Sequence, residues 1–259
     1  MVASRQRRNC SARTGRLSAV LLALTIELAP SSGQNKQAPV ARVPFVGCRS
    51  DGQAGPVEAP DEAEKAVQVE PGIAQKLAYY KSAVTPGSLG PRGWYCLGEY
   101  GSGGSSILFI KPEPIAEATL AEITGPVIEI DSNSGDTSGR FEVARVIARV
   151  FPKHLAFVQS VIDLFDFFAS EVAYGPYPTD KLVYRSDRVV EYITPPNSIG
   201  LGTTNFVKPN DEPIEGVAIL QGPTPDLLLL SVRLPPDMYA IKSPVIRHLE
   251  YEASNQPYR

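Results

Sequence analysis

Short strand-like runs dominate the pattern of hydrophobic and polar positions along the chain. A half-buried strand repeats every two residues, so short alternating or apolar runs between glycine and proline clusters predict strands. The glycine-rich residues 101–105 separate two such runs as a β-hairpin turn does. A phosphate-binding loop is the alternative there, but such a loop opens a helix, and a strand-like run follows. The predicted strands lie at 66–70, 94–100, 105–111, 126–132, 182–185 and 189–194.

Two later runs are apolar almost without interruption. Residues 216–220 read GVAIL and residues 226–234 read DLLLLSVRL, and Pro235 and Pro236 end the second run. An alternating strand has one solvated face, whereas a continuously apolar strand is typical of a position covered on both faces. These two runs therefore predict central strands of a sheet.

A helical period begins at about residue 139. Glu142, Arg145 and Arg149 recur at spacings of three and four, and apolar side chains fill most of the other positions. Ser138 or Gly139 is placed to cap the free N–H groups of this helix. With Gly139 as the cap, the Glu142 side chain could bond back to the cap N–H, as in half a capping box.

Prolines mark the starts of three further predicted helices. Pro152 ends the first helix and starts a second one, which the apolar positions of residues 153–168 continue. Pro71 suits the first position of a helix that residues 73–83 continue. Pro244 can begin a last short helix.

These elements predict a mixed α+β fold with a mainly antiparallel sheet and a packed helix pair. We expect a single domain at 43–252, because the N-terminal half holds few core residues of its own. A flexible tether is expected at 34–42, and a frayed tail at 253–259. Residues 51–65 are acidic and rich in glycine and proline, so they predict a solvated loop.

The start of the chain has the pattern of a signal peptide. Five arginines and no acidic residue precede the apolar run at 17–26, which is shorter than the roughly 20 residues that span a bilayer. Small residues at 31–33 suit cleavage. We therefore expect a signal peptide at 1–33 and a periplasmic or secreted protein. A buried N-terminal helix is the alternative, but its basic flank would have no use in a core.

The charge balance argues against nucleic acid and anionic membranes as partners. The chain has 25 Lys and Arg against 28 Asp and Glu, a formal charge of −3. Without residues 1–33, which hold five Arg and one Glu, the counts are 20 and 27, a charge of −7. Both kinds of partner need a basic surface. No later run reaches about 18 apolar residues, so no transmembrane segment is expected in the mature chain.

The cysteines predict one disulfide. Of the three cysteines, Cys10 lies in the leader, so the exported protein keeps Cys48 and Cys96, and we predict that these two pair. A metal pair and a reactive thiol are the alternatives, but two cysteines without a nearby histidine make a poor zinc site. Neither a metal nor a cofactor is expected.

Candidate catalytic residues are few, and none is assigned. The stretch GDTSG around Ser138 is close to the surround of a serine-protease nucleophile, but it leads into a predicted helix, and both histidines lie downstream. We interpret Ser138 as a residue of the helix start. His154 is interpreted as a cap or surface residue, and His248 as a residue near a helix C-terminus. An acid–base cluster of His154 with Asp163 or Asp166 is the alternative, but nine residues separate His154 from Asp163, roughly 13 Å of helix.

A charged cluster and the loop that follows it are the candidate ligand-binding residues. The cluster belongs to the two short strands near residue 187, and the loop reads GLGTTN. The alternative is a solvated sheet face with weak ion pairs and an ordinary turn. The candidates are Arg185, Asp187, Arg188, Glu191, Thr203 and Thr204.

Three blocks of sequence carry a resemblance. They are VPFVGC with PRGWYC, SGDTSGRFEVARVIARVFP, and GPYPTDKLVYRSDRVVEY. Together they resemble a group of uncharacterised secreted proteins from Gram-negative bacteria, over most of residues 43–236. The resemblance implies export and a single compact unit. It implies no activity, cofactor, partner or functional residue.

Two classes of function remain open. The first is a non-catalytic binding or interaction module whose partner is a small ligand, a cell-envelope component or another protein. The second is an envelope hydrolase that uses carboxylates or a serine, since paired carboxylates leave no sequence signature. A pair of carboxylates with raised pKa in one pocket would favour the enzyme. An apolar groove or an exposed sheet edge would favour the binding module.

Overall fold

A computed structural model describes residues 39–101, 103–115 and 122–255. Residues 37–259 form one unit. The expected signal peptide lies outside the described residues. Within the described ranges, no helix is long and apolar enough to cross a membrane.

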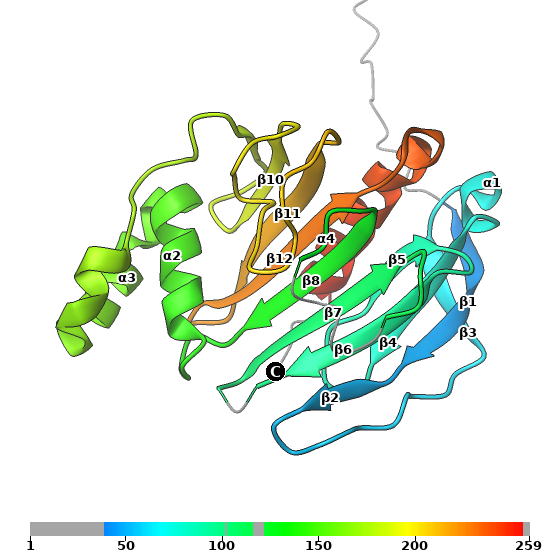
Figure 1. Cartoon of the computed structure of the whole chain (residues 1–259), viewed down its shortest axis with the longest axis horizontal. Helices are drawn as coiled ribbons and strands as arrows, with labels where there is room; N and C mark the ends of the chain where they lie inside the picture. The colour runs from blue at the N-terminus through cyan, green and yellow to red at the C-terminus, as the bar shows by residue number, and fades with distance from the viewer. Residues whose placement is uncertain (1–38, 102, 116–121, 256–259) are drawn as a thin grey trace, which may run out of the picture. The chain divides into compact units, whose positions relative to one another are not determined.

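The larger sheet has eight strands in the described part of the chain, in the order β2-β6-β7-β8-β12-β11-β10-β9 (Figure 1). All neighbouring strands are antiparallel except β2 and β6. All of the predicted strands except the one at 66–70 form this sheet, which confirms the mixed, mainly antiparallel α+β fold. The bounds are β2 (Ser50–Gly52), β6 (Tyr95–Tyr100), β7 (Ser105–Lys111), β8 (Val127–Asn133), β9 (Lys181–Tyr184), β10 (Val189–Thr194), β11 (Ile214–Gln221) and β12 (Asp226–Arg233).

Both continuously apolar runs are central strands, as predicted. Strand β12 lies between β11 and β8. Leu228 and Leu230 enter one hydrophobic core, and Leu227 and Leu229 enter another. Because successive side chains of a strand point to opposite faces, these two cores lie on opposite faces of the sheet. The run has no polar face because neither face is solvated.

A smaller sheet has four strands among the described residues, in the order β3-β1-β4-β5. Strands β1 and β4 are parallel, and the other pairs are antiparallel. The predicted disulfide joins this sheet to the larger one, since Cys48 ends β1 and Cys96 lies in β6, with 5.4 Å between their Cα atoms. The bounds are β1 (Val40–Cys48), β3 (Glu64–Gln68), β4 (Leu77–Ser82) and β5 (Ser88–Pro91).

The prediction of a helix after Pro71 is wrong for most of the segment. Helix α1 covers only Pro71–Ala74, and strand β4 follows. Four successive residues, 77–80, are buried. The Tyr79 hydroxyl donates to Glu252, and the Tyr80 hydroxyl donates to the Pro91 carbonyl. Burial on all sides suits a strand paired on both edges, and these long-range contacts outweigh a local helical preference.

Three predicted boundaries also differ from the structure. The expected tether at 34–42 overlaps β1, which begins at Val40. The expected loop at 51–65 contains most of β2 and the start of β3. The expected frayed tail overlaps helix α4, which continues through Ala253 to Asn255 because Ala253 is buried against the core.

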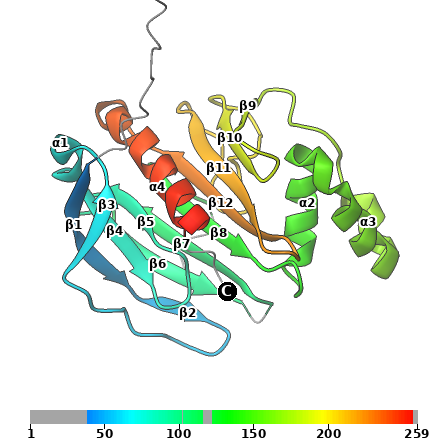
Figure 2. The same cartoon turned by 180° about the vertical axis from the view of Figure 1, so that it is seen from behind.

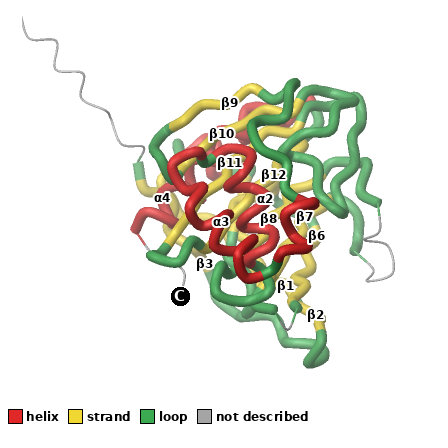
Figure 3. Tube along the Cα trace, turned by 90° about the vertical axis from the view of Figure 1, so that its left-hand side faces the viewer, coloured by secondary structure: helices red, strands yellow, loops and turns green. Residues whose placement is uncertain are grey.

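The predicted helix pair packs on one face of the larger sheet. Figure 3 shows α2 (Arg140–Val150) and α3 (Leu155–Leu164) in front of the strands. The short 3₁₀ helices η2 (Pro152–His154) and η3 (Asp166–Glu171) flank α3. Gly139 is the N-cap of α2, but no side chain caps the helix, so the half capping box is not formed. The Gly139 N–H instead donates to the Thr137 hydroxyl.

Helix α4 (Lys242–Asn255) follows the 3₁₀ helix η4 (Pro236–Ile241) and covers the opposite face (Figure 2). Its residues Val245 and Leu249 enter the core that contains Leu228 and Leu230. The two sets of helices therefore lie on opposite faces of the sheet. Of the two faces, the one that carries α2 also holds the polar pocket described below.

Helix α4 also buries a histidine that should make stability depend on pH. His248 is 5 % exposed and stacks edge-on against Tyr79, with 5.8 Å between ring centroids. Burial lowers its pKa, an effect that Lys65 increases and Glu252, at 3.6 Å, opposes. The neutral imidazole is therefore the folded form, whereas the unfolded chain protonates near pH 6.5.

We expect His248→Phe to reduce the loss of stability on acidification. Below about pH 6.5 the unfolded state of the wild type binds the additional proton, so its unfolding free energy falls by up to about 1.4 kcal/mol per pH unit through this residue. Phenylalanine keeps the ring contact and cannot titrate. Urea unfolding at pH 7.5 and pH 5.5 gives the unfolding free energy of the wild type and of the variant. An equal loss in the two proteins would show that His248 is not the group responsible.

Candidate functional site

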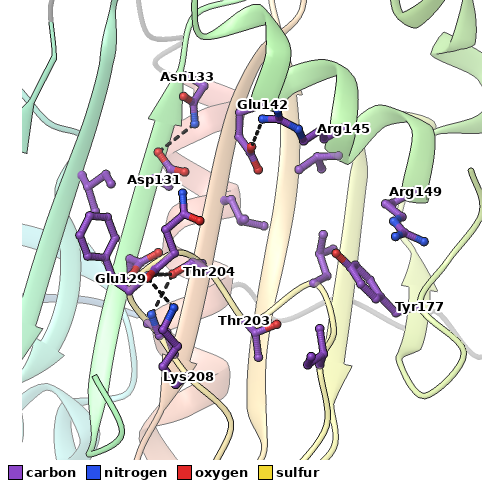
Figure 4. Close-up of a pocket in the computed structure, with 18 of the residues that line it drawn as sticks. Glu129, Asp131, Asn133, Glu142, Arg145, Arg149, Tyr177, Thr203, Thr204 and Lys208 are labelled. Atoms are coloured by element: carbon purple, nitrogen blue, oxygen red, sulfur yellow. Dashed lines mark hydrogen bonds and ion pairs between the residues drawn. The ribbon is translucent and has the colours of Figure 1, made fainter. Parts of the chain in front are cut away.

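A polar pocket opens on the face of the sheet that carries α2. Its volume is about 790 Å³. Strand β8 forms its floor, α2 forms one wall, and the loop at residues 199–209 forms another (Figure 4). The pocket thus joins a central strand to two segments that follow it in the chain.

The floor carries polar residues at three successive same-face positions of β8. Glu129, Asp131 and Asn133 are two residues apart, so their side chains leave the same face of the strand. The alternate residues Ile128 and Ile130 are completely buried in the core on the other side. The pattern VIEIDSN therefore places two carboxyl groups side by side where the sheet is covered by α2.

Glu129 is buried among weakly polar neighbours. It is 1 % exposed, and its partners across the sheet are Phe109 and Ser231. The Thr204 hydroxyl donates to its Oε2 atom at 3.2 Å. Burial raises the pKa of Glu129 to about 8, and the charge of Asp131 adds to the rise. Glu129 is therefore largely protonated at neutral pH.

Asp131 lies two residues further along β8, on the same floor of the pocket. Ile107 and Leu229 flank it on the neighbouring strands. Burial raises its pKa to about 7, and the charge of Glu142 adds to the rise. The Asn133 amide donates to Asp131 Oδ1 at 2.8 Å, which opposes the rise. Asp131 therefore titrates near neutral pH, below Glu129.

Within the described residues, no cation is ion-paired with either acid, although the charges of Arg233 and Lys208 act on Glu129 from further away. Among the described residues, neither carboxyl group forms an ion pair. Lys208 lies near Glu129, but its ammonium group donates to the Asn205 carbonyl at 2.7 Å. No group of three or more potential metal ligands occurs in the described ranges. Burial therefore dominates both raised pKa values, and the hydrogen bonds and the more distant charges of Arg233 and Lys208 offset it only in part.

The wall formed by α2 carries two arginines, each held by neighbouring side chains. Arg145 donates to Glu142 at 3.2 Å and also to Glu171. One turn later, the Arg149 guanidinium stacks over the Tyr177 ring, 4.2 Å from its centroid. The helical period places these arginines on the face that looks into the pocket, as Figure 4 shows.

The loop at 199–209 is held in place from both ends. Asp180 accepts hydrogen bonds from the Leu201 N–H at 2.7 Å and from the Thr194 hydroxyl at 2.8 Å. At the other end, the Arg233 guanidinium donates to the Lys208 carbonyl at 2.6 Å. The Thr204 hydroxyl accepts bonds from the backbone within this loop, which directs its own hydrogen to Glu129.

The six predicted ligand-binding residues do not come together. Thr203 and Thr204 line this pocket, whereas the four charged residues do not. Arg185 forms a two-bond ion pair with Glu191 at 2.6 and 2.8 Å. Arg188 donates to the Gly222 carbonyl at 2.9 Å, and the Asp187 carbonyl contacts the His154 ring at 3.0 Å. Of the four charged residues, Arg185 and Glu191 therefore pair with each other, and Arg188 bonds to the backbone.

The arrangement of a serine protease is not formed. Ser138 is exposed in the turn before α2 and does not line this pocket. His154 lines a separate, shallower hollow, with its ring against the Asp187 carbonyl. In the described part of the chain, Ser138 and the histidines share no hydrogen bond. The interpretation of Ser138 as part of a helix start therefore agrees with its position.

Comparisons of the chain with protein-family models, curated proteins and solved structures found no match. Roles for the pocket residues must therefore come from the geometry of the pocket itself.

Proposed function

We propose that the protein is a glycoside hydrolase that uses Glu129 as its general acid and Asp131 as its general base. The observation that carries this proposal is the pair of carboxyl groups on one pocket floor, with pKa values of about 8 and about 7 and no ion pair to either group among the described residues. Catalytic carboxyl groups need pKa values near the working pH, and burial is the usual means of raising them.

The surroundings of the two acids assign the roles, because Glu129 is almost completely buried whereas Asp131 is partly exposed and can reach a water. At neutral pH Glu129 keeps its proton, while Asp131 is the first of the pair to lose its own. Glu129 would give its proton to the departing glycosidic oxygen as the bond to the anomeric carbon breaks. Asp131 would take a proton from the water that attacks this carbon. One water is consumed, and solvent returns the proton from Asp131 to Glu129.

The spacing of the pair supports an inverting reaction. Two residues of a strand rise roughly 6.8 Å, so the Cα atoms of Glu129 and Asp131 are about that far apart, and parallel side chains would keep a similar separation. Inverting glycosidases keep their carboxyl groups about 6.5–9.5 Å apart to leave room for water, and retaining ones about 5–5.5 Å apart. The threonines and amides of the pocket provide hydrogen-bond partners for sugar hydroxyl groups. The disulfide suits an oxidising compartment, and so a substrate in or beyond the cell envelope.

The test is hydrolysis of a panel of nitrophenyl glycosides and soluble polysaccharides by the purified exported protein. We expect turnover with inversion at the anomeric carbon, and its loss in the double variant E129Q/D131N. The matched control is Glu250→Gln. Glu250 also has a pKa of about 7, raised by burial and by the neighbouring Glu191, but it lies outside the pocket.

A folded double variant that retains turnover would overturn the assignment. Turnover lost equally in E250Q would show that the effect is not specific to the pocket pair.

A non-catalytic binding module is the second candidate, and one observation favours it. Strand β9 is an edge of the larger sheet, with Val183 46 % and Tyr184 53 % exposed. An exposed edge can pair with an extended segment of a partner. Absence of turnover on every substrate, with a protein captured through β9, would favour this candidate over the hydrolase.

A further inference from the structure

Arg149 brings into the pocket a positive charge that is not ion-paired with any carboxylate of the described residues. The residue is half-buried in the last turn of α2, and one of its N–H groups donates a 3.3 Å bond to the Gly175 carbonyl. It forms no ion pair within the described residues. Asp180 interacts with it electrostatically, but the Asp180 oxygens accept from Thr194 and Leu201. Since a guanidinium has five N–H donors, most of those of Arg149 are available to a ligand.

The Tyr177 ring fixes the plane of this guanidinium. The stacking distance of 4.2 Å is within the range of a cation–π contact. Figure 4 shows Arg149 and Tyr177 on the side of the pocket away from Glu129 and Asp131. A planar guanidinium held in one orientation matches the two oxygens of a carboxylate. One ligand in the pocket could therefore contact the acid pair and Arg149 together.

The other two cations of the pocket are less available. Arg145 is bonded to two glutamates, and the Lys208 ammonium group is bonded to a backbone carbonyl. With Glu129 protonated and Asp131 ionised, as hydrolysis needs, the lining carries three cationic and three anionic side chains. Arg149 still forms no ion pair within the described residues, and an anion on the ligand would neutralise its charge.

We propose that the pocket takes an acidic carbohydrate, with the substrate carboxylate bound by Arg149 and the glycosidic oxygen facing Glu129. The inference rests on the proposed function for the bond that is cut. The Arg149 subsite itself can be tested without turnover, because a sugar acid needs only to bind.

The experiment is a calorimetric titration of the purified exported protein with glucuronate and, separately, with the methyl ester of glucuronic acid. The ester keeps the shape of the sugar and removes its charge. We expect the wild type to bind glucuronate roughly tenfold more tightly than the ester, as expected for hydrogen bonds between charged groups. Arg149→Met should bind both sugars about equally. Arg188→Met is the matched control, since Arg188 is also half-buried and also donates to a glycine carbonyl.

Three results would overturn the subsite: no glucuronate binding by the wild type, equal binding of acid and ester, or an unchanged preference in a folded R149M. If R188M also lost the preference for glucuronate over the ester, the preference would not arise from the Arg149 subsite.

The double variant E129Q/D131N separates this inference from the proposed function. Its floor side chains are neutral, as they are in the protonated wild type, so glucuronate binding should persist although hydrolysis is lost. Binding without any hydrolysis by the wild type would support the subsite and contradict the hydrolase. Hydrolysis of neutral glycosides without preferential binding of glucuronate would support the hydrolase and contradict the Arg149 subsite.

Discussion

Replacing Glu129 by glutamine is expected to lower turnover by roughly 10²–10⁴-fold, the usual contribution of a general acid. Glutamine has the size of the protonated glutamic acid, and its amide oxygen can still accept the bond from Thr204. It has no proton to give to a leaving oxygen. The measurement is kcat on the best substrate of the panel, for a variant shown to be folded.

The pH dependence of turnover should report both members of the pair. Turnover needs Asp131 ionised, which requires a pH above about 7, and Glu129 protonated, which requires a pH below about 8. The wild type should therefore give a narrow bell between these values. The two limbs belong to the interacting pair, because ionisation of one acid raises the pKa of the other. A Glu129→Gln variant should lose the alkaline limb.

Stability provides a readout of Glu129 that does not depend on activity. Its pKa in the folded protein is about 8, above the ordinary value of 4.5. Between these two values the folded state keeps a proton that the unfolded state has lost, so wild-type stability falls as the pH rises. The loss through this group should be on the order of a few kcal/mol between pH 5 and pH 8.5. E129Q should lose no stability through this group as the pH rises. The control is Glu215→Gln, which removes a partly exposed carboxylate paired with Lys242 and should keep the wild-type loss.

Equal pH dependence in the wild type and E129Q, together with turnover within a few-fold of the wild type, would contradict the role of Glu129. The position would then be an ordinary buried polar residue.

The elements predicted well are those that local pattern determines. The run DLLLLSVRL can be satisfied only by a strand with apolar surroundings on both faces, and β12 has them. The spacing of Glu142, Arg145 and Arg149 leaves one face of α2 for the core, and the helix forms there. In these cases the local preference and the tertiary environment agree.

The segment after Pro71 was mispredicted because distant residues determine its structure. Residues 79–82 pair with β1, 34 positions earlier in the chain. The Tyr79 hydroxyl donates to Glu252, which lies near the C-terminus. Leucine, alanine and lysine in this segment are good helix formers, so the local signal favoured the wrong element. A parallel strand pair, formed between distant segments, leaves no short-range pattern.

The acid pair had a sequence signal that we did not interpret. The strand VIEIDSN alternates, and alternation with Glu and Asp indicates a solvated face. The sequence does not show that α2 and the 199–209 loop cover this face, so that Glu129 is buried and Asp131 half-buried. Thr203 and Thr204 were identified from the loop composition, but the charged cluster named with them lies outside the pocket. Composition finds candidate groups, and only the topology brings them together.

Arg233 joins this covering loop to the segment before β8. Its side chain is almost completely buried at the end of β12, with 1 % exposure. Its guanidinium donates to three backbone carbonyls, at 2.8 Å to Gly125, 2.6 Å to Lys208 and 2.9 Å to Ile123. These carbonyls belong to the segment before β8 and to the 199–209 loop. Burial lowers the pKa of Arg233, which shows the cost of placing the charge there.

Arg233→Met should lower the unfolding free energy by roughly 3–5 kcal/mol, because the variant leaves buried carbonyls without their charged donor. Methionine keeps the apolar stem and its packing. Urea unfolding at pH 7 measures the loss, with Arg188→Met as a control that should cost about 1 kcal/mol for its one carbonyl bond. Hydrogen exchange at the Ile123 and Lys208 amides, which bond across the two segments, should accelerate in R233M alone. A loss below about 1 kcal/mol would mean that the loop is held elsewhere.

The same substitution should also change the acid that the loop covers. The positive charge of Arg233 lowers the pKa of Glu129, so its removal should raise that pKa above the wild-type value. The alkaline limb of the turnover profile should then move to higher pH in whatever fraction of R233M remains folded, while the acid limb set by Asp131 stays in place. A shift of the alkaline limb alone would link Arg233 to the ionisation of Glu129. A uniform loss of turnover at every pH would instead mean that Arg233 acts only by holding the loop.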